Sequence, residues 1–227
     1  MRGEPLLQIE DVRFAYGPGA PPVLDGVNLT LGVDDSLAVI GPSGCGKSTL
    51  LNVIGTLERP SAGRVLLGGQ ELTRLEGKAL AAVRNRKIGF IFQDHHLLPQ
   101  CTILENVLLP TLAGHGIDKV DAANRARHLL QRVGLSERAH HRPGEVSGGQ
   151  RQRAAVVRAL IHRPSLLLAD EPTGSLDRAS AQNLSELLCE LNHEEHVAMI
   201  IVTHAQDLAS KMSRILELED GQLHDHS

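Results

Sequence analysis

Apolar residues recur in short runs along much of the chain, and in several of these runs they alternate with polar residues, as they do in β-strands. Candidate strands lie at residues 6–16, 24–31, 36–41, 64–69, 87–93, 165–170, 197–204 and 214–223. Another segment, "LLNVIGTL" at residues 50–57, has its apolar residues at helical spacing instead. This mixture of strands and helices predicts a domain of the α/β class.

The pattern changes between residues 93 and 164, where apolar residues recur every three or four positions. Such spacing predicts helices, here at residues 102–113, 121–135 and 148–163. Pro99, Pro110 and Pro143 punctuate the region. The length of 227 residues suits one large domain. We therefore expect a single domain over residues 1–227, with a mainly helical lobe inserted at about 95–162.

A glycine-rich segment, "GPSGCGKSTL" at residues 41–50, separates a predicted strand from a predicted helix. It fits the phosphate-binding pattern G-x-x-x-x-G-K-[ST], with Gly41, Gly46, Lys47 and Ser48 in register. Glycines let backbone N–H groups converge on an anion, and the following helix adds the positive end of its dipole. The alternative is a glycine loop with a structural role. The candidate nucleotide ligands here are Gly41, Pro42, Ser43, Gly44, Cys45, Gly46, Lys47, Ser48 and Thr49.

Two carboxylates end the apolar run "SLLLADEP". Asp170, at the tip of the predicted strand, is a candidate magnesium ligand together with the Ser48 hydroxyl. Glu171 follows it and is a candidate base that polarises an attacking water. Lys47 would offset charge on the outer phosphates. The alternative is an ordinary acidic loop after a strand, and the presence of the phosphate-binding pattern makes that the weaker interpretation.

The segment "VSGGQRQR" at residues 146–153 resembles the signature sequence LSGGQ of the ABC ATPases, with Val146 in place of leucine. A Ser-Gly-Gly turn that opens a helix is a second anion-binding end. Further motifs similar to those of the family follow its order along essentially the whole chain: Tyr16, Gln93 in "IFQD", "GSLD" at 174–177, and His204 in "IVTH". The resemblance implies an ABC-type P-loop NTPase, with an N-terminal antiparallel β-subdomain and a helical subdomain inserted in a RecA-like core.

The resemblance also implies roles for these residues. In the family, two copies bind two ATP molecules head to tail, and the signature of one copy covers the nucleotide held by the phosphate loop of the other. His204 would stabilise charge on the γ-phosphate, and Tyr16 would stack on adenine. Taken alone, Tyr16 could be an ordinary strand residue, Gln93 a surface residue and His204 a capping or core histidine. The remaining assignments are nucleotide contacts at Gln93, Ser147, Gly148, Gly149, Gln150 and Asp177, catalysis by Lys47, Gln93, Glu171 and His204, and magnesium at Ser48, Gln93 and Asp170.

Residues 84–110 resemble one group within the family, which serves lipoprotein release, macrolide efflux and cell division. The sequences "HHLLP", "ADEPTGSLD" and "KMSRILELEDGQL" are most similar to the lipoprotein-release ATPases. This resemblance implies an integral membrane permease with extracytoplasmic domains as partner, contacted through residues 93–107 at the cytoplasmic face of the inner membrane. The alternatives are efflux or division ATPases of the same group, and a soluble ABC ATPase scaffold in a non-transport assembly.

Composition narrows the classes of function. The net charge of −4 gives no support to nucleic-acid binding, which favours a basic surface. No stretch of 18 uncharged apolar residues is present, and the N-terminus lacks the apolar stretch of a signal peptide. Three cysteines without a CxxC pair indicate a reducing compartment. Cys45 lies in the phosphate loop near a predicted helix N-terminus, a position that can lower the pKa of a thiol. One hypothesis is that alkylation of Cys45 blocks ATP binding; the alternative is a small tolerated residue with no regulatory role. The histidine pairs at 95–96 and 140–141 lack companion ligands for a metal.

Overall fold

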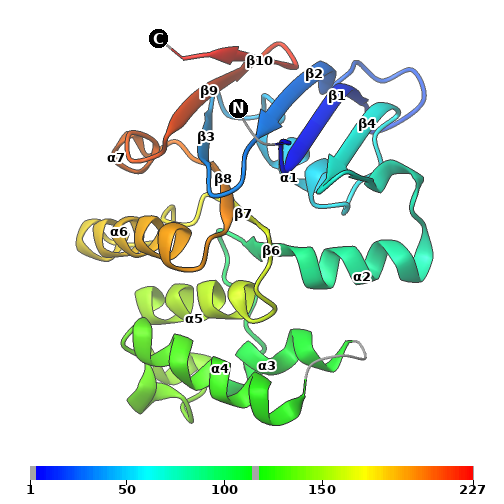
Figure 1. Ribbon diagram of the computed structural model, residues 1–227. Coiled ribbons are helices and arrows are strands. Elements are labelled where there is room, and N and C mark those ends of the chain that lie inside the picture. Colours follow the sequence, from blue (N-terminus) through cyan, green and yellow to red (C-terminus); the bar gives the residue numbers. More distant parts are fainter. Residues whose placement is uncertain (1–3, 114–117, 227) are drawn as a thin grey trace.

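The structure, a computed structural model, describes residues 4–113 and 118–226, which form two sheets and the helices that pack against them (Figure 1). One sheet has the strand order β10-β9-β3-β8-β7-β6. These strands are β3 (Ser36–Ile40), β6 (Ile88–Ile91), β7 (Leu166–Asp170), β8 (Ala198–Val202), β9 (Arg214–Glu219) and β10 (Gln222–Asp225). Strand β10 is antiparallel to β9, and the other neighbours are parallel. The carboxyl ends of β3 and β7 therefore lie at the same edge, where Gly41 and Glu171 follow them.

The second sheet is antiparallel and has the order β2-β1-β4-β5. Its strands are β1 (Leu7–Phe14), β2 (Leu24–Leu31), β4 (Ala62–Leu67) and β5 (Gln70–Glu71). Buried residues alternate along β1 at Leu7 and Ile9, and then shift by one position to Val12 and Phe14. The shift coincides with Asp11, whose φ of 45° belongs to a β-bulge. The bulge keeps the apolar side chains on the face that packs against the rest of the core.

Alternate residues of β3 are buried in two different cores. Leu37 and Val39 belong to a cluster that joins the antiparallel sheet, α1 (Lys47–Ile54) and one face of the parallel sheet. Ala38 belongs to a second cluster, which the helices on the opposite face complete. Because both faces of β3 are covered, its sequence reads as a continuous apolar run, as expected of a central parallel strand. The segment that follows β3 thus extends from a rigid base.

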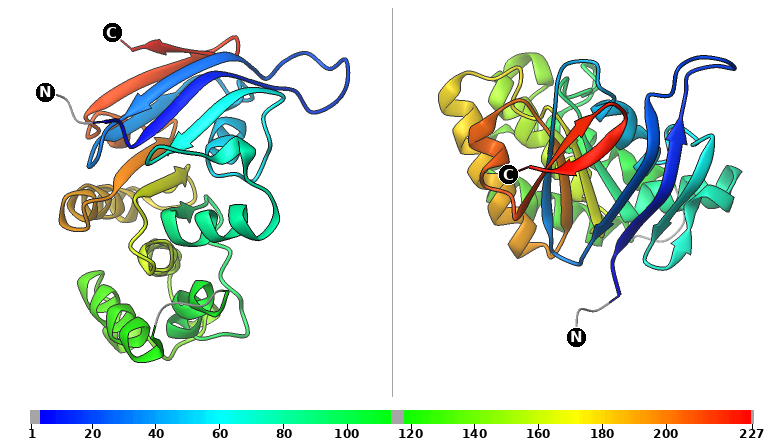
Figure 2. Two further views of the ribbon diagram at one scale, coloured as in Figure 1. Left: turned by 45° about the vertical axis from the view of Figure 1, so that its right-hand side comes forward. Right: turned by 90° about the horizontal axis from the view of Figure 1, so that it is seen from above.

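The helices between β6 and β7 gather at the end of the molecule opposite the antiparallel sheet (Figures 1 and 2). They are α3 (Ile103–Leu112), α4 (Lys119–Arg132) and α5 (Gly148–Leu160), with 3-10 turns at Ser136–Arg138 and Pro143–Glu145. A capping box starts α3, since Thr102 Oγ1 accepts from the Glu105 amide at 3.2 Å and Glu105 Oε2 accepts from the Thr102 amide at 2.7 Å. Domain limits at about 95 and 162 stay a prediction.

The other helices are α2 (Gly77–Lys87), α6 (Arg178–Glu194) and α7 (Gln206–Ala209), and a 3-10 turn lies at Leu72–Arg74. None of the helices in the described part of the chain has the length and apolar character needed to span a bilayer.

The fold differs from the sequence-based expectation in two details. The last predicted strand, at 214–223, is a hairpin of β9 and β10 that turns at Asp220 and Gly221. The pattern also gave no sign of α2, in which Val83 is the buried residue. Residues 1–3, at the N-terminus, and residues 114–117, within the predicted helical lobe, lie outside the described residues.

Candidate functional site

The loop after β3 needs glycine for both its conformation and its close packing. Gly41, Gly44 and Gly46 have φ values of 144°, 80° and 106°, in the region that side chains rarely adopt. A Cβ at Gly41 would lie 2.4 Å from the carbonyl oxygen of Leu218, in β9, and a Cβ at Gly46 would lie 2.7 Å from Val23 Cγ1. The loop is therefore pressed against the C-terminal hairpin and the start of β2.

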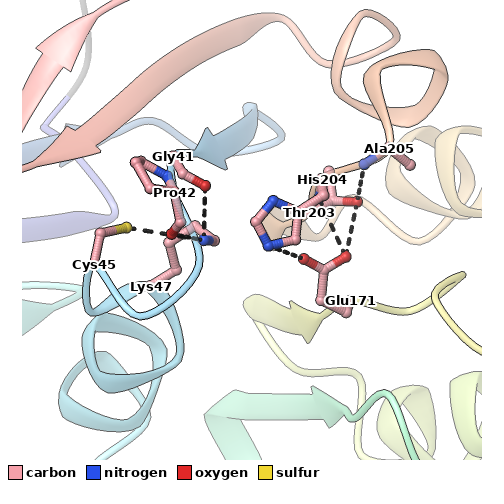
Figure 3. A network of polar contacts seen from close by, with 8 residues as sticks. All are labelled: Gly41, Pro42, Cys45, Lys47, Glu171, Thr203, His204 and Ala205. Carbon is pink, nitrogen blue, oxygen red and sulfur yellow. Dashed lines mark hydrogen bonds and ion pairs between the residues drawn. The ribbon is translucent and has the colours of Figure 1, made fainter.

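Lys47 begins α1 and points back beneath the loop (Figure 3). Lys47 is buried, with 6% of its surface exposed. Its Nζ donates to the carbonyl oxygens of Gly41 and Pro42 at 2.9 and 2.7 Å, and Cys45 Sγ lies 3.8 Å away. Gly41, Pro42 and Cys45, all predicted as ligands, thus surround the lysine and do not line the cleft described below.

The first turn of α1 has no side-chain acceptor for its amides, since its N-cap is Gly46 and it contains no acidic residue. By contrast, Thr102, Asp118, Ser147 and Asp177 cap α3, α4, α5 and α6. An uncapped helix N-terminus beside a buried ammonium group is suited to bind an anion.

Glu171, after β7, faces the end of β8 (Figure 3). Its φ is 44°, and its amide donates to the Val202 carbonyl at 2.9 Å. The Oε2 atom accepts from the Thr203 hydroxyl and from the His204 amide, both at 3.2 Å. The Oε1 atom lies 3.4 Å from His204 Nε2 but accepts no hydrogen bond from the described residues. One carboxylate oxygen is thus held by two donors, and the other keeps its capacity to accept a proton.

A cleft of about 830 Å³ joins these elements. It brings together most residues that the sequence predicted for nucleotide, magnesium and catalysis: Tyr16, Ser43, Gly44, Gly46, Lys47, Ser48, Thr49, Gln93, Asp170, Glu171 and His204. It also includes residues to which the sequence pattern assigned no individual role, namely Val23, Thr173, Gly174, Ala181, Val202 and Ala205. Thr173, Gly174, Val202 and Ala205 lie in or directly beside the motifs "EPTGSLD" and "IVTH", and this proximity was the available signal. Val23 and Ala181 lie outside these motifs, and their apolar side chains gave no signal.

Tyr16 presents its ring at the edge of this cleft. The Tyr16 residue is 68% exposed, although its hydroxyl forms a 2.8 Å hydrogen bond with Thr49 Oγ1, in α1. Phe14 packs against the Tyr16 ring edge-on, with 5.0 Å between ring centroids. An aromatic ring that is fixed at its edge and tip, with a free face, is suited to stack on a base.

The signature residues do not line the cleft. Ser147 caps α5 in a capping box, in which its Oγ accepts from the Gln150 amide at 3.3 Å and Gln150 Oε1 accepts from the Ser147 amide at 2.9 Å. Gly149 lies against α6, where a Cβ would be 3.2 Å from Ser180 Oγ. Asp177 caps α6, and hydrogen bonds from the Ser180 side chain and backbone lower the pKa of its carboxyl. Ser147, Gly148, Gly149, Gln150 and Asp177 therefore form a second group, apart from the cleft.

The paired histidines have separate local partners. His95 Nδ1 accepts from the Leu97 amide at 3.1 Å, and burial followed by the charges of Arg151 and Arg158 lowers its pKa. The His96 ring packs on Phe92, 5.1 Å between centroids. Within the described residues, no group of three or more His, Cys, Asp or Glu side chains is arranged to hold a metal.

The sequence is similar to those of known proteins over nearly its whole length. The sequence profile described as "ABC transporter" matches residues 24–174. The chain is 49% identical over 220 residues to the lipoprotein-releasing system ATP-binding protein LolD of Geobacter metallireducens, covering 96% of this chain and 97% of that protein. It is 48% identical to LolD 1 of Rhodopirellula baltica, covering 96% of each.

Solved structures are similar over nearly the same length. The dimeric structure of MJ0796, a bacterial ABC transporter cassette, superposes with a TM-score of 0.86 at 37% identity and covers 96% of each chain. A post-hydrolysis dimer of MJ0796 bound to ADP and Pi also gives 0.86, at 35% identity over 97% of each. The predicted fold class and the resemblance seen in the sequence are confirmed: this chain belongs to the ABC transporter family.

Proposed function

We propose that this chain is the ATP-hydrolysing subunit of a membrane transporter for lipoprotein release. The observation that carries the proposal is one cleft lined by Lys47, Asp170, Glu171 and His204, which come from three separate parts of the chain. The near full-length similarity to two LolD proteins supports lipoprotein release over the efflux and division alternatives.

ATP binding follows from the loop and its surroundings. The uncapped amides of α1 and the Lys47 ammonium would hold the β- and γ-phosphates, and Tyr16 would stack on the adenine. The ADP and Pi bound to the related MJ0796 cassette support a nucleotide as the ligand.

The residues in the cleft also fit a magnesium ion. Ser48, Gln93 and Asp170 line it together and offer a hydroxyl, an amide oxygen and a carboxylate, the hard oxygen donors that magnesium prefers beside substrate phosphates. When bound, the ion would neutralise charge on the phosphates.

We assign hydrolysis to Glu171, which follows β7, and His204, which follows β8. Glu171 Oε1, which accepts no hydrogen bond from the described residues, would accept a proton from the attacking water. His204, which is half-exposed, would donate to the γ-phosphate and stabilise its charge.

The second anion-binding end requires a second chain. Ser147 and Gly149 lie apart from the cleft of their own chain, so we propose that they cover the γ-phosphate held by Lys47 of a partner in a head-to-tail homodimer. The MJ0796 cassette, similar in fold and sequence, has been solved as a dimer.

The permease partner is proposed to dock at the junction of the helical lobe with the rest of the chain, at the cytoplasmic face of the inner membrane. A groove of about 500 Å³ lies there between α2, β6, α3 and α5, with Phe90, Phe92 and Pro110 in its lining. The groove adjoins the predicted transmission segment 93–107, and its residue His96 belongs to both.

The proposal is tested with Glu171→Gln, which keeps the shape of the side chain and removes the base. We expect turnover to fall by about 100-fold or more, and ATP to convert the chain into a stable dimer in size-exclusion chromatography. Used as bait with ATP in solubilised membranes, this dimer should retain an integral membrane subunit with a large extracytoplasmic domain.

The control is Lys47→Ala, which by itself should neither form a homodimer with ATP nor hydrolyse it. Wild-type turnover in Glu171→Gln would remove Glu171 from its role. Recovery of a purely soluble complex would favour an assembly scaffold over a transporter.

A further inference from the structure

The backbone of Gln93 is held from two sides. On one side, Gln152 Nε2 donates to the carbonyl oxygen of Phe92 at 2.8 Å. On the other, the Ser175 hydroxyl donates to the carbonyl oxygen of Gln93 itself at 3.4 Å. The two carbonyls belong to the peptide groups before and after the Gln93 Cα atom. The hydrogen bonds therefore constrain both peptide planes of Gln93, and with them the direction in which its side chain starts.

Gln152 is a buried residue, 1% exposed, in the helix α5 that Ser147 caps. A buried amide donor that keeps its hydrogen bond fixes the position of its acceptor, because leaving either group unpaired is costly. Arg158, further along α5, donates to the carbonyl oxygens of His95 and His96 at 2.8 and 2.7 Å. The segment after β6 is therefore attached to α5 on both sides of Asp94.

The strand that leads into this segment is also tightly packed on α5. A Cβ at Gly89, in β6, would lie 2.5 Å from the carbonyl oxygen of Ala159. Such an approach leaves no room for β6 and α5 to slide past each other. Strand β6, the segment 92–96 and α5 thus form one packed unit, with Ser147 at one of its ends.

Contacts on the opposite side come from the loop that follows Glu171. Ser175 lies in that loop, and a Cβ at Gly174 would be 3.3 Å from Gln93 Nε2. Gln93 thus lies between the helix of the signature and the loop of the catalytic carboxylate.

From this arrangement we propose that Gln152 is a positioning residue for Gln93. By donating to the Phe92 carbonyl, it fixes the position of Gln93 relative to Ser147. When Ser147 contacts the nucleotide held by the partner, Gln93 is therefore also placed to contact the magnesium and phosphates in the cleft of its own chain. The inference rests on the proposed function, and it assigns a role to a residue of α5 that does not line the cleft.

The test replaces Gln152 with methionine, which keeps the length of the side chain but has no N–H to donate. We expect kcat to fall about tenfold, equivalent to one hydrogen bond's worth of transition-state stabilisation, and the magnesium concentration for half-maximal activity to rise several-fold. The affinity for a fluorescent ATP analogue without magnesium should stay within about twofold, since the phosphate loop is not touched.

Asn106→Leu is the matched control for a purely structural role. Asn106 is also a fully buried amide, and it donates to the carbonyl oxygens of Leu98 and Cys101, each at 3.1 Å, in the same loop but beyond Gln93. This variant should lower the melting temperature without moving the magnesium midpoint. If Gln152→Met did the same, Gln152 would be a packing residue and the inference would be wrong.

A double variant completes the test. With Gln93→Ala already in place, Gln152→Met should cause little further loss of kcat, whereas full additivity of the two losses would overturn the inference. Wild-type turnover in Gln93→Ala alone would refute the role of Gln93 and this inference together. The proposed ATPase function would still stand in that case, provided that Lys47→Ala abolished turnover.

Discussion

At the scale of single residues, the carboxylate of Glu171, the proposed catalytic base, is held by a neighbour that the sequence analysis did not assign to the site. The Ala205 amide donates to Thr203 Oγ1 at 3.0 Å, so the single proton of this hydroxyl is directed to Glu171 Oε2 (Figure 3). Thr203 is fully buried. It therefore orients the carboxylate and leaves Oε1 turned toward His204.

We predict that Thr203→Val, of nearly equal size, lowers kcat about tenfold while the affinity for ATP is unchanged, because one hydrogen bond to a charged group is lost. Thr203→Ser should restore most of the rate, since it keeps the hydroxyl. Steady-state ATPase assays and equilibrium nucleotide binding measure the two quantities. A valine variant with the wild-type rate would exclude this role.

Residue identity predicted much of the cleft, since Lys47, Asp170 and Glu171 carry their chemistry in their side chains. Thr203 escaped prediction because its importance arises from the pairing of β7 with β8, which sets Asp170 opposite Val202. That register is a tertiary property, and the local pattern of apolar residues does not encode it.

At the scale of elements, helix α5 combines a cap and a candidate ligand in one residue. Ser147 starts the helix through its capping box, and it is also proposed to contact phosphate across the dimer. Helical spacing of the apolar residues predicted α5, which is 13 residues long, whereas continuous apolar runs predicted β3 and β7, in each of which four of the five residues are buried. It missed α2, which has too few buried residues to produce a period.

The two roles of Ser147 can be separated by substitution. Aspartate is as good an N-cap as serine, so the free energy of unfolding of Ser147→Asp should lie within about 0.5 kcal/mol of the wild-type value. That of Ser147→Ala should be lower by about 1 kcal/mol. The added carboxylate would repel the partner's phosphate, so ATPase activity of Ser147→Asp should fall by more than about tenfold. Chemical denaturation and ATPase assays provide the comparison. Normal activity in Ser147→Asp would show that Ser147 acts only as a cap.

At the scale of the whole molecule, the two groups of predicted ligands lie in different places. The cleft carries Lys47 and Glu171, and the N-terminus of α5 carries Ser147 away from it. The sequence alone predicted this division only through resemblance, because no periodicity reveals which residues share a cleft. In a head-to-tail dimer, each active site would be built from one group of each chain.

Mixing two impaired variants tests this arrangement. A heterodimer of Lys47→Ala with Ser147→Asp would contain one site with both defects and one with none. We predict that the ATPase activity of the mixture exceeds that of either variant alone and rises with the fraction of heterodimer. If the mixture never exceeded the activity of Ser147→Asp alone across a titration of the two chains, the head-to-tail arrangement would be contradicted.

The close contact between Gly41 and β9 has a practical consequence for handling this protein. The floor of the phosphate loop is the Leu218 carbonyl, and the following turn is bonded to β2 where the Asp25 amide donates to Gly221 at 2.9 Å. Truncating the chain before β9, or inserting a purification tag into the β9–β10 turn, would therefore remove or displace the backbone that packs against the phosphate loop. A tag added after β10 would leave the contact between Leu218 and Gly41 intact.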